Sequence, residues 1–230
     1  MIDFHSHILP GVDDGSKSVE ESCKMLQLLS QQGVERVIAT PHFLANKENV
    51  TDFLSRRRAS FETLKPSLTK DMPEILLGAE VKYYQGISRL ENLRQLCIQS
   101  SNLLLLEMSP VKWTEYTIKE IVDISSSGIN VVLAHVERYS SFQSSKTLEQ
   151  LMNCDILMQV NADSFNDWLT RRKTLKLLVN NRAGLIGSDC HNLTTRSPRI
   201  GEAFEVIEKK LGKCFVNQIN EYGKSLFYVN

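Results

Sequence analysis

Short apolar runs recur along the chain and alternate with longer segments in which apolar and polar residues are mixed. Runs of this length, apolar almost throughout, are typical of strands that are buried on both faces of a parallel sheet. Seven such runs are predicted as strands: Ile2–Phe4, Arg36–Ala39, Ile75–Gly78, Leu103–Leu106, Asn130–Ala134, Ile156–Val160 and Leu185–Gly187. Most begin roughly 25–40 residues after the previous run, which is the size of one strand–helix unit.

Four of the intervening segments are predicted to be helices. Ser18 and Glu21 carry the pattern of a capping box at the start of the first helix, and Gly33 stands where that helix is expected to end. The other three helices are expected over Phe53–Leu64, Glu115–Ser126 and Thr170–Asn180. Seven strands that alternate with helices predict an α/β fold, a single domain over residues 1–230 whose parallel sheet closes into a barrel one strand short of the usual eight. An open, doubly wound sheet is the alternative.

Composition narrows the classes of function. Hydrophobic residues make up 42% of the chain and charged residues 23%, as in a globular protein with a sizeable core. The 27 basic and 27 acidic residues balance, which argues against a protein dedicated to nucleic acid or to a membrane surface. Five cysteines without a CxxC pair are typical of reduced thiols, and we expect a cytoplasmic location. Neither a membrane-spanning segment nor a signal peptide is expected.

All five histidines of the chain lie at the carboxyl end of a predicted strand or within about four residues of it. They are His5, His7, His42, His135 and His191. In barrels and in open parallel sheets alike, this end of the strands binds ligands. A single histidine in such a place is more often a surface or core residue than a ligand, but five together favour a shared site.

Carboxylates follow the predicted strands in the same way. Glu80, Glu107 and Asp189 each stand just after a run, and Asp14 lies in the Gly11–Gly15 turn. A glutamate at the end of four leucines is costly to bury unless it is paired, binds a metal or, as Glu107 could, donates a proton. Mixed imidazole and carboxylate ligands suit zinc, iron or manganese, and their number here exceeds what one ion binds. The residues therefore predict two or three ions bridged by a carboxylate, a centre typical of phosphate-ester hydrolysis.

Six short motifs, in this order, carry a resemblance to a known family. They are His5-Ser6-His7, Gly11-Val12-Asp13-Asp14-Gly15, Ala39-Thr40-Pro41-His42, Gly78-Ala79-Glu80, Ala134-His135-Val136-Glu137-Arg138-Tyr139 and Gly187-Ser188-Asp189-Cys190-His191-Asn192. From residue 1 to about residue 196 the chain resembles the polymerase and histidinol phosphatase (PHP) superfamily. More closely, it resembles the bacterial manganese-dependent protein-tyrosine phosphatases that are encoded with capsule and exopolysaccharide genes.

The resemblance implies a distorted seven-stranded (β/α) barrel of the TIM type and three divalent metal ions, manganese in most members, with iron and zinc as alternatives. It assigns the first ion to His5, His7, Glu80 and Asp189, the second to Glu80, Glu107 and His135, and the third to Asp14, His42 and His191. It also assigns catalytic, phosphate-binding roles to Arg138 and Arg196. Val136, Asp163 and Cys190 depart from the residues common in the family, but none of them is a proposed ligand.

The function that the resemblance implies is hydrolysis of phosphotyrosine on the tail of a bacterial tyrosine kinase that regulates capsule or exopolysaccharide synthesis. A water activated by the metal ions would attack phosphorus, and the two arginines would bind the phosphate oxygens. The alternative is a metal-dependent phosphoesterase for a small substrate such as histidinol phosphate. The complete ligand set disfavours a non-catalytic scaffold, and the formal net charge of +0 disfavours a nuclease or polymerase-associated editing domain. The oligomeric state, a homo-oligomer included, is left open.

One further motif points to a different chemistry. Cys190, Arg196 and Ser197 match the C-x5-R-S signature of phosphatases that use a cysteine nucleophile. The intervening loop contains no glycine, however, and both neighbours of Cys190 are proposed metal ligands. On an extended strand end, Cys190 would point away from both of them. We therefore expect Cys190 to be a packed thiol.

Overall fold

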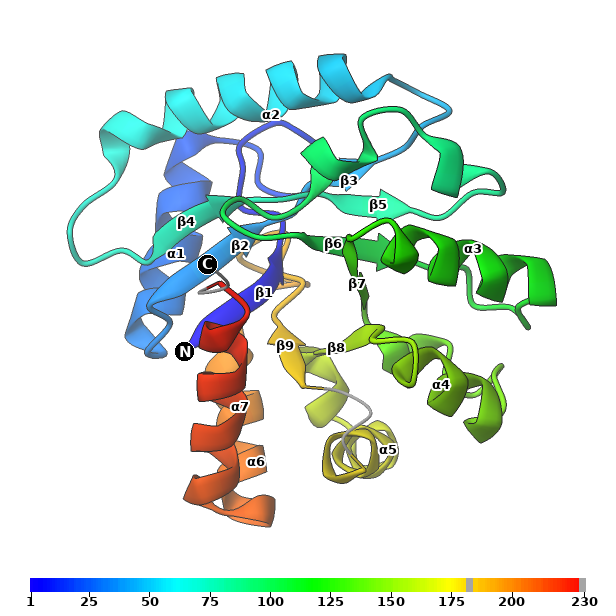
Figure 1. The fold of residues 1–230 in the computed structure, drawn as a ribbon. Helices are drawn as coiled ribbons and strands as arrows, with labels where there is room; N and C mark the ends of the chain where they lie inside the picture. The colour runs from blue at the N-terminus through cyan, green and yellow to red at the C-terminus, as the bar shows by residue number, and fades with distance from the viewer. Residues whose placement is uncertain (181–183, 228–230) are drawn as a thin grey trace.

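A curled parallel β-sheet runs through the centre of the protein, and the helices pack around its outer side (Figure 1). The computed structural model describes residues 1–180 and 184–227. The strands are β1 (Ile2–Ser6), β2 (Arg36–Ala39), β3 (His42–Phe43), β4 (Glu74–Leu77), β5 (Glu80–Lys82), β6 (Leu103–Glu107), β7 (Asn130–Leu133), β8 (Leu157–Asn161) and β9 (Leu185–Gly187). All seven predicted strands are confirmed, and β3 and β5 are short additional strands that the pattern does not predict.

Hydrogen bonding divides the strands between two sheets. One has the order β1-β2-β4 and the other β3-β5-β6-β7-β8-β9, with every pair parallel. The α/β class is confirmed, but a closed seven-stranded barrel is not, because the described strands pair as a three-stranded and a six-stranded sheet. The chain interrupts strand pairing between β2 and β3 and again between β4 and β5. Pro41, at the first break, has no N–H to donate. At the second, Gly78 passes so close to Ile98 that a Cβ would lie 3.1 Å from its Cγ1. An isolated parallel bridge between Ser6 and Cys190 links the two sheets.

In the part of the chain that the structure describes, seven α-helices connect or follow the strands. They are α1 (Val19–Gln31), α2 (Val50–Leu64), α3 (Glu115–Ser126), α4 (Ser145–Met152), α5 (Trp168–Val179), α6 (Ile200–Leu211) and α7 (Lys213–Ser225). Short 3-10 turns lie at Lys65–Ser67, Ile87–Arg89, Leu93–Leu96, Val136–Arg138 and Ala162–Phe165. The four predicted helices are confirmed as α1, α2, α3 and α5, whereas α4, α6 and α7 were not predicted. Within the described residues, no helix is long and apolar enough to cross a membrane.

Side-chain caps determine where the helices begin. The Ser18 hydroxyl accepts a hydrogen bond from the Glu21 N–H at 3.1 Å, which is one half of the predicted capping box. The Glu21 carboxylate accepts from the Lys17 N–H at 2.8 Å rather than from that of Ser18. Asn49 and Thr114 cap α2 and α3 in the same way as Ser18 caps α1. Each cap therefore fixes the residue at which the preceding loop joins its helix.

The sheet separates two apolar clusters. Successive residues of a strand point into different clusters, so a strand such as β6 must be apolar at every position. Leu104 belongs to the larger, outer cluster beneath the helices, whereas its neighbour Leu105 belongs to the inner one. The inner cluster consists of Ile2, Phe4, Ile38, Leu76, Ile98, Leu103, Leu105, Val132, Ala134 and Leu185. The C-terminal segment covers it at the amino end of β1, where the Phe227 ring stacks on Phe4 at 5.9 Å. Apolar residues thus fill the space inside the curled sheet below the carboxyl ends of the strands.

Leu104→Ala tests the packing of the outer cluster. Leu104 is fully buried, so its truncation leaves a cavity, and we expect the free energy of unfolding to fall by about 2–5 kcal/mol. Leu169 is 55% exposed and provides the matched control. Leu169→Ala removes the same atoms from the surface and should change stability by less than about 0.5 kcal/mol. Urea unfolding followed by circular dichroism measures both variants, and equal losses would contradict the assignment of Leu104 to the core.

Candidate metal centre

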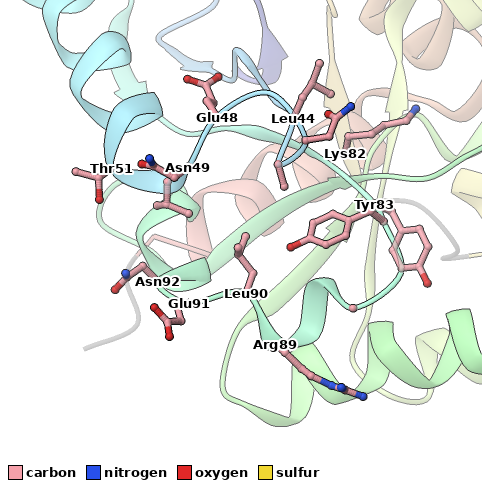
Figure 2. A pocket seen from close by; sticks show the side chains of 15 residues that line it. Leu44, Glu48, Asn49, Thr51, Lys82, Tyr83, Arg89, Leu90, Glu91 and Asn92 are labelled. Carbon is pink, nitrogen blue, oxygen red and sulfur yellow. The ribbon is translucent and has the colours of Figure 1, made fainter.

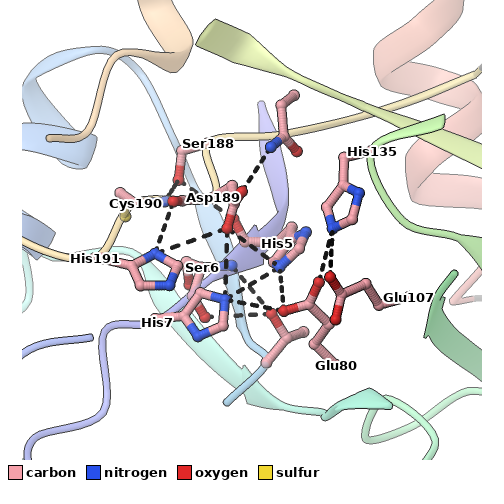
Figure 3. A network of polar contacts seen from close by, with 12 residues as sticks. His5, Ser6, His7, Glu80, Glu107, His135, Ser188, Asp189, Cys190 and His191 are labelled. Carbon is pink, nitrogen blue, oxygen red and sulfur yellow. Dashed lines mark hydrogen bonds and ion pairs between the residues drawn. The ribbon is translucent and has the colours of Figure 1, made fainter. Parts of the chain in front are cut away.

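The nine side chains predicted as metal ligands gather at the carboxyl ends of the strands. They come from β1 and the turn after it (His5, His7, Asp14), from β3 and β5 (His42, Glu80), from the end of β6 and the segment after β7 (Glu107, His135), and from the segment after β9 (Asp189, His191). Seven of them are labelled in Figure 3, where their polar ends point toward one another. Parallel strands place their carboxyl ends at one edge, which is why residues so far apart in the sequence share a site.

Four donors of the first predicted set lie at the spacing of metal ligands. His5 Nε2 and His7 Nε2 are 3.1 Å apart. Glu80 Oε2 lies 3.3 and 3.4 Å from these two nitrogens, and Asp189 Oδ1 lies 3.5 Å from each. Ligands with bonds of about 2.1 Å in tetrahedral geometry are about 3.4 Å apart. The donor atoms of His5, His7 and Glu80 all lie within 4.8 Å of one another, a spacing that fits a divalent ion, and Asp189 adjoins the two imidazoles.

Glu80 connects the first set with the second. Its Oε1 lies 2.9 Å from His135 Nε2, while its Oε2 lies 2.9 Å from His42 Nδ1. Glu107 is farther out, since its Oε1 is 3.9 Å from His135 Nε2 and 3.0 Å from the Lys82 ammonium. Glu107 therefore reaches the second set but is paired with a cation at the edge of the site.

The third predicted set lies closer to solvent. Asp14 Oδ1 is 3.4 Å from His42 Nε2 and 3.6 Å from His191 Nε2. Together with His7, these residues offer donor atoms that all lie within 4.8 Å of one another. His7 thus lies between the first and third sets, a position that its sequence motif does not indicate.

Burial and neighbouring charges set the protonation of these ligands. Glu80 is 1% exposed, and burial alone would raise its pKa, but the facing imidazoles, His5 above all, hold that pKa well below its usual range. Burial, followed by the charge of His7, lowers the pKa of His191 to about 4. Burial alone would lower the pKa values of His5 and His7, but the facing carboxylates raise them, so these two imidazoles would release a proton on binding a metal ion. Glu80 and His191 already favour the ionised carboxylate and the neutral imidazole that bind metals.

Glu80 Oε2 and His191 Nε2 are among the buried atoms that make no hydrogen bond of good geometry in residues 1–180 and 184–227, although Glu80 Oε2 lies 2.9 Å from His42 Nδ1. Buried polar atoms are seldom left unsatisfied. His191 Nδ1 lies 2.9 Å from the Asp189 carbonyl oxygen, so Nδ1 carries the proton and Nε2 has its lone pair available. A cation would satisfy both orphaned atoms, and mixed nitrogen and oxygen donors suit manganese, iron or zinc. The residues present therefore fit a divalent metal centre.

Both predicted arginines contact the carboxylate of Asp189. Arg138 Nη2 lies 2.6 Å from Asp189 Oδ2, and Arg196 Nη2 lies 2.7 Å from Asp189 Oδ1. Asn161 also donates to Oδ2, at 2.6 Å. The side chains of Arg138 and Arg196 are 47% and 35% exposed, so each guanidinium faces solvent as well as the first ligand set. An anion that approaches the cluster from solvent would meet both arginines.

The sequence patterns miss two residues that support the ligands. Asp13 Oδ2 lies 2.7 Å from His7 Nδ1, the ring nitrogen that faces away from the first set. Gln159 Oε1 accepts a hydrogen bond from the His135 backbone N–H at 2.8 Å. Groups of this kind fix the orientation of metal-binding histidines. The neighbouring pair Asp13 and Asp14 is visible in the sequence, but their adjacency does not indicate which carboxylate supports and which one faces the ions.

Cys190 is a buried thiol, as expected. Burial, together with the nearby Asp3 carboxylate, raises the pKa of the Cys190 thiol far above its usual range. Its backbone carbonyl accepts a hydrogen bond from the His7 N–H at 2.9 Å. A thiol that remains protonated is a poor nucleophile, which disfavours a cysteine mechanism and favours the interpretation of Cys190 as a packed thiol.

Sequence comparison finds relatives along nearly the whole chain. The profile of the family described as "Capsular polysaccharide synthesis, CpsB/CapC" matches residues 1–225. The tyrosine-protein phosphatase CpsB of Streptococcus agalactiae serotype III (strain NEM316) is 29% identical over 243 residues, covering 95% of this chain and 94% of that protein. The tyrosine-protein phosphatase YwqE of Bacillus subtilis (strain 168) is 28% identical over 232 residues, covering 98% of this chain and 91% of that protein.

Solved structures share the fold. The crystal structures described as YwqE from Bacillus subtilis and CpsB from Streptococcus pneumoniae, metal-dependent tyrosine phosphatases, include a chain that matches with a TM-score of 0.86 at 25% identity. The match covers 99% of this chain and 94% of that one. These findings confirm the predicted resemblance and the predicted enzyme class, a hydrolase of the protein-tyrosine phosphatase type. Because the family profile spans residues 1–225, the chain belongs to the CpsB/CapC family of capsular polysaccharide synthesis.

Proposed function

We propose that this protein is a metal-dependent phosphatase that removes phosphate from tyrosine residues in the tail of a bacterial kinase that regulates capsule or exopolysaccharide synthesis. The observation that carries the proposal is the convergence of the first ligand set on one point, with Arg138 and Arg196 at its edge. The family and the names of its relatives support phosphotyrosine as the substrate class and capsule synthesis as the process.

Three divalent ions, with manganese as the first candidate, would be held by three sets of ligands. The sets are His5, His7, Glu80 and Asp189, then Glu80, Glu107 and His135, and finally Asp14, His42 and His191. Such ions, when bound, supply an activated water and neutralise charge on the phosphate. The two oxygens of Glu80 face different imidazoles, His135 on one side and His42 on the other, which supports its role as a shared ligand.

Arg138 and Arg196 would bind the oxygens of the substrate phosphate. The planar guanidinium matches phosphate with paired N–H groups and offsets the charge that develops on it. Both side chains already reach the first ligand set through Asp189 and remain accessible from solvent. A tyrosine leaving group, with a pKa of ~10, requires less proton donation than an alkoxide. A role for Glu107 as a metal ligand is therefore favoured over a role as the proton donor to the leaving group.

The barrel expected from the sequence would explain why all ligands share one edge. Backbone hydrogen bonds run from Gly78 N to Ala39 O at 2.8 Å and from Glu80 N to Pro41 O at 3.1 Å, across both breaks. We regard β2 with β3, and β4 with β5, as single interrupted strands. With the bridge between β1 and the segment after β9, they would form a distorted seven-stranded barrel, one domain over residues 1–230.

The proposed compartment is the cytoplasm. All five cysteines of the chain are free. Free thiols are typical of proteins kept under reducing conditions. A kinase tail in the same compartment would be accessible to this enzyme.

Metal removal tests the proposed chemistry. Hydrolysis of p-nitrophenyl phosphate and of a phosphotyrosine peptide should cease after chelation and return with manganese, because the ligand sets would then hold the ions again. His5→Ala removes a donor from the first set and should lower kcat/KM by about 10³-fold or more. Cys190→Ser should retain activity, because the thiol takes no part in the reaction.

Two other results would contradict this proposal. Activity that survives chelation but is lost in Cys190→Ser would overturn the metal-dependent mechanism. Faster hydrolysis of histidinol phosphate than of phosphotyrosine peptides, assayed at the same manganese concentration, would overturn the substrate class and favour the small-substrate alternative.

Asp13→Asn tests the support of His7. The substitution removes the charge that faces His7 Nδ1 at 2.7 Å, so we expect manganese affinity to fall by about 10–100-fold. Activity should recover when manganese is supplied in excess. Isothermal titration calorimetry measures the affinity, and Asp123→Asn, at an exposed position on α3, is the matched control. Unchanged affinity in Asp13→Asn would show that Asp13 does not position a ligand.

Arg138→Lys tests recognition of the phosphate. Lysine keeps the positive charge but lacks the planar pair of donors, so kcat/KM for a phosphotyrosine peptide should fall by about 10–100-fold. Bound manganese, measured by elemental analysis, should stay at the wild-type level. Arg172→Lys makes the same substitution at an exposed position on α5 and is the matched control. A loss of metal that parallels the loss of activity would reassign Arg138 to the support of Asp189.

A further inference from the structure

A groove of about 830 Å³ lies beside the candidate metal centre, along the segments that follow β3 and β5. Its apolar surface includes Leu44, Val50, Tyr84 and Leu90. In Figure 2, Leu44 lies toward one end of the cavity, and the segment that carries Arg89 lies toward the other. Its volume is in the range of cavities that bind ligands much larger than a phosphate group.

The groove continues directly from the ligand cluster. β3 and β5 pair in parallel with His42 opposite Glu80. Leu44 and Lys82 line the groove, and each lies two residues beyond a candidate ligand, His42 or Glu80. Two residues of extended chain span roughly 7 Å. Glu48 and Leu44 also line the adjoining cavity of about 570 Å³ that contains Asp14 and His42. A substrate with its phosphate at the ligand cluster would therefore extend into this groove.

A buried carboxylate holds one wall of the groove in place. Glu120, on α3, is 2% exposed and accepts hydrogen bonds from the Tyr83 hydroxyl at 2.7 Å, the Gly86 N–H at 2.8 Å and the Ser88 hydroxyl at 3.2 Å. Burial and the Glu120 carboxylate raise the pKa of Tyr83 to about 12, so its hydroxyl keeps the proton that it donates. Three donors compensate for the burial of one carboxylate. The wall is therefore formed before any ligand binds.

Arg89 is the cation of this groove that remains available to a ligand. Lys82 is paired with Glu107, and Glu48 is paired with Arg56. The Arg89 side chain is exposed and makes neither an ion pair nor a hydrogen bond to any other described residue. Glu91 also lines the cavity but is not paired with Arg89. An anionic group in the groove would find its partner at Arg89.

We propose that this groove binds the peptide segment that flanks the phosphotyrosine, with apolar side chains against Leu44, Tyr84 and Leu90 and an acidic group at Arg89. This inference rests on the proposed function. The acidic group is a carboxylate of the peptide, whose paired oxygens match a guanidinium. A small phosphate ester would leave the groove empty, so the groove also gives a physical reason for preferring a protein substrate.

Direct binding provides the first test. Three fluorescent peptides carry a non-hydrolysable phosphonate in place of the phosphotyrosine, with neutral flanks, with acidic flanks, or with a second phosphonate. They are titrated with the manganese-loaded full-length protein and followed by anisotropy. Arg89→Glu should weaken binding of the peptide with acidic flanks by about tenfold and leave the neutral peptide within about twofold. A larger loss for the peptide with a second phosphonate would contradict the assignment of the acidic group to a carboxylate. Arg172→Glu, exposed on α5, should change none of them.

Turnover provides the second test and separates the two proposals. Tyr84→Ala should raise KM for hydrolysable phosphotyrosine peptides by about tenfold and leave kcat/KM for p-nitrophenyl phosphate unchanged, because only the peptide reaches the groove. Equal effects of Arg89→Glu on all three phosphonate peptides, or no effect on any, would overturn the groove proposal even if phosphatase activity is intact. Binding that depends on Arg89 in a protein without manganese-dependent turnover would support the groove and overturn the proposed function.

Discussion

The ionised carboxylate of Glu80, buried among imidazoles, is the interaction on which the rest of the site depends. His5, His42 and His135 approach it from different strands and segments. Groups of this kind are costly to gather away from water, and the inner apolar cluster offers them no solvation. The register of the parallel strands, which sets His42 opposite Glu80, holds them together nonetheless. A cation at their centre would offset this cost, and the same atoms would then connect the stability of the fold with its chemistry.

Most of the strands, and the gathering of the candidate ligands at one edge (Figure 3), could be predicted because the ends of the strands carry two signals at once. Leu103–Leu106 is apolar on both faces, and Glu107 follows it without an intervening loop. An apolar run followed by a metal-binding residue marks the point at which a strand leaves the core and reaches the edge of the sheet. His5 and His135 follow the apolar runs Ile2–Phe4 and Asn130–Ala134 in the same way. The prediction of a strand and the prediction of a candidate ligand at its end both require only the local sequence, without knowledge of contacts between distant segments.

The features that could not be predicted depend on contacts between segments that are far apart in the sequence. β3 contains two residues, too few for any periodic pattern. Asp13 accepts a hydrogen bond from the His42 N–H and Glu120 accepts one from the Tyr83 hydroxyl, both from other parts of the chain. Their sequence neighbours do not distinguish these two residues from exposed carboxylates. Helix α6 is a different case, because its buried residues recur every three or four positions and that signal was available in the sequence.

The bridge between Ser6 and Cys190 has a consequence for how the protein is made. The Asp3 carboxylate accepts a hydrogen bond from the Ser188 N–H across 185 residues of sequence, and His5 meets Asp189 at the same place. During synthesis, the first histidines leave the ribosome long before the last ligands are translated. Contacts of such long range form late in folding. A nascent or truncated chain therefore holds only fragments of the candidate site, which is complete only when the segment around His5 has met the segment around Asp189.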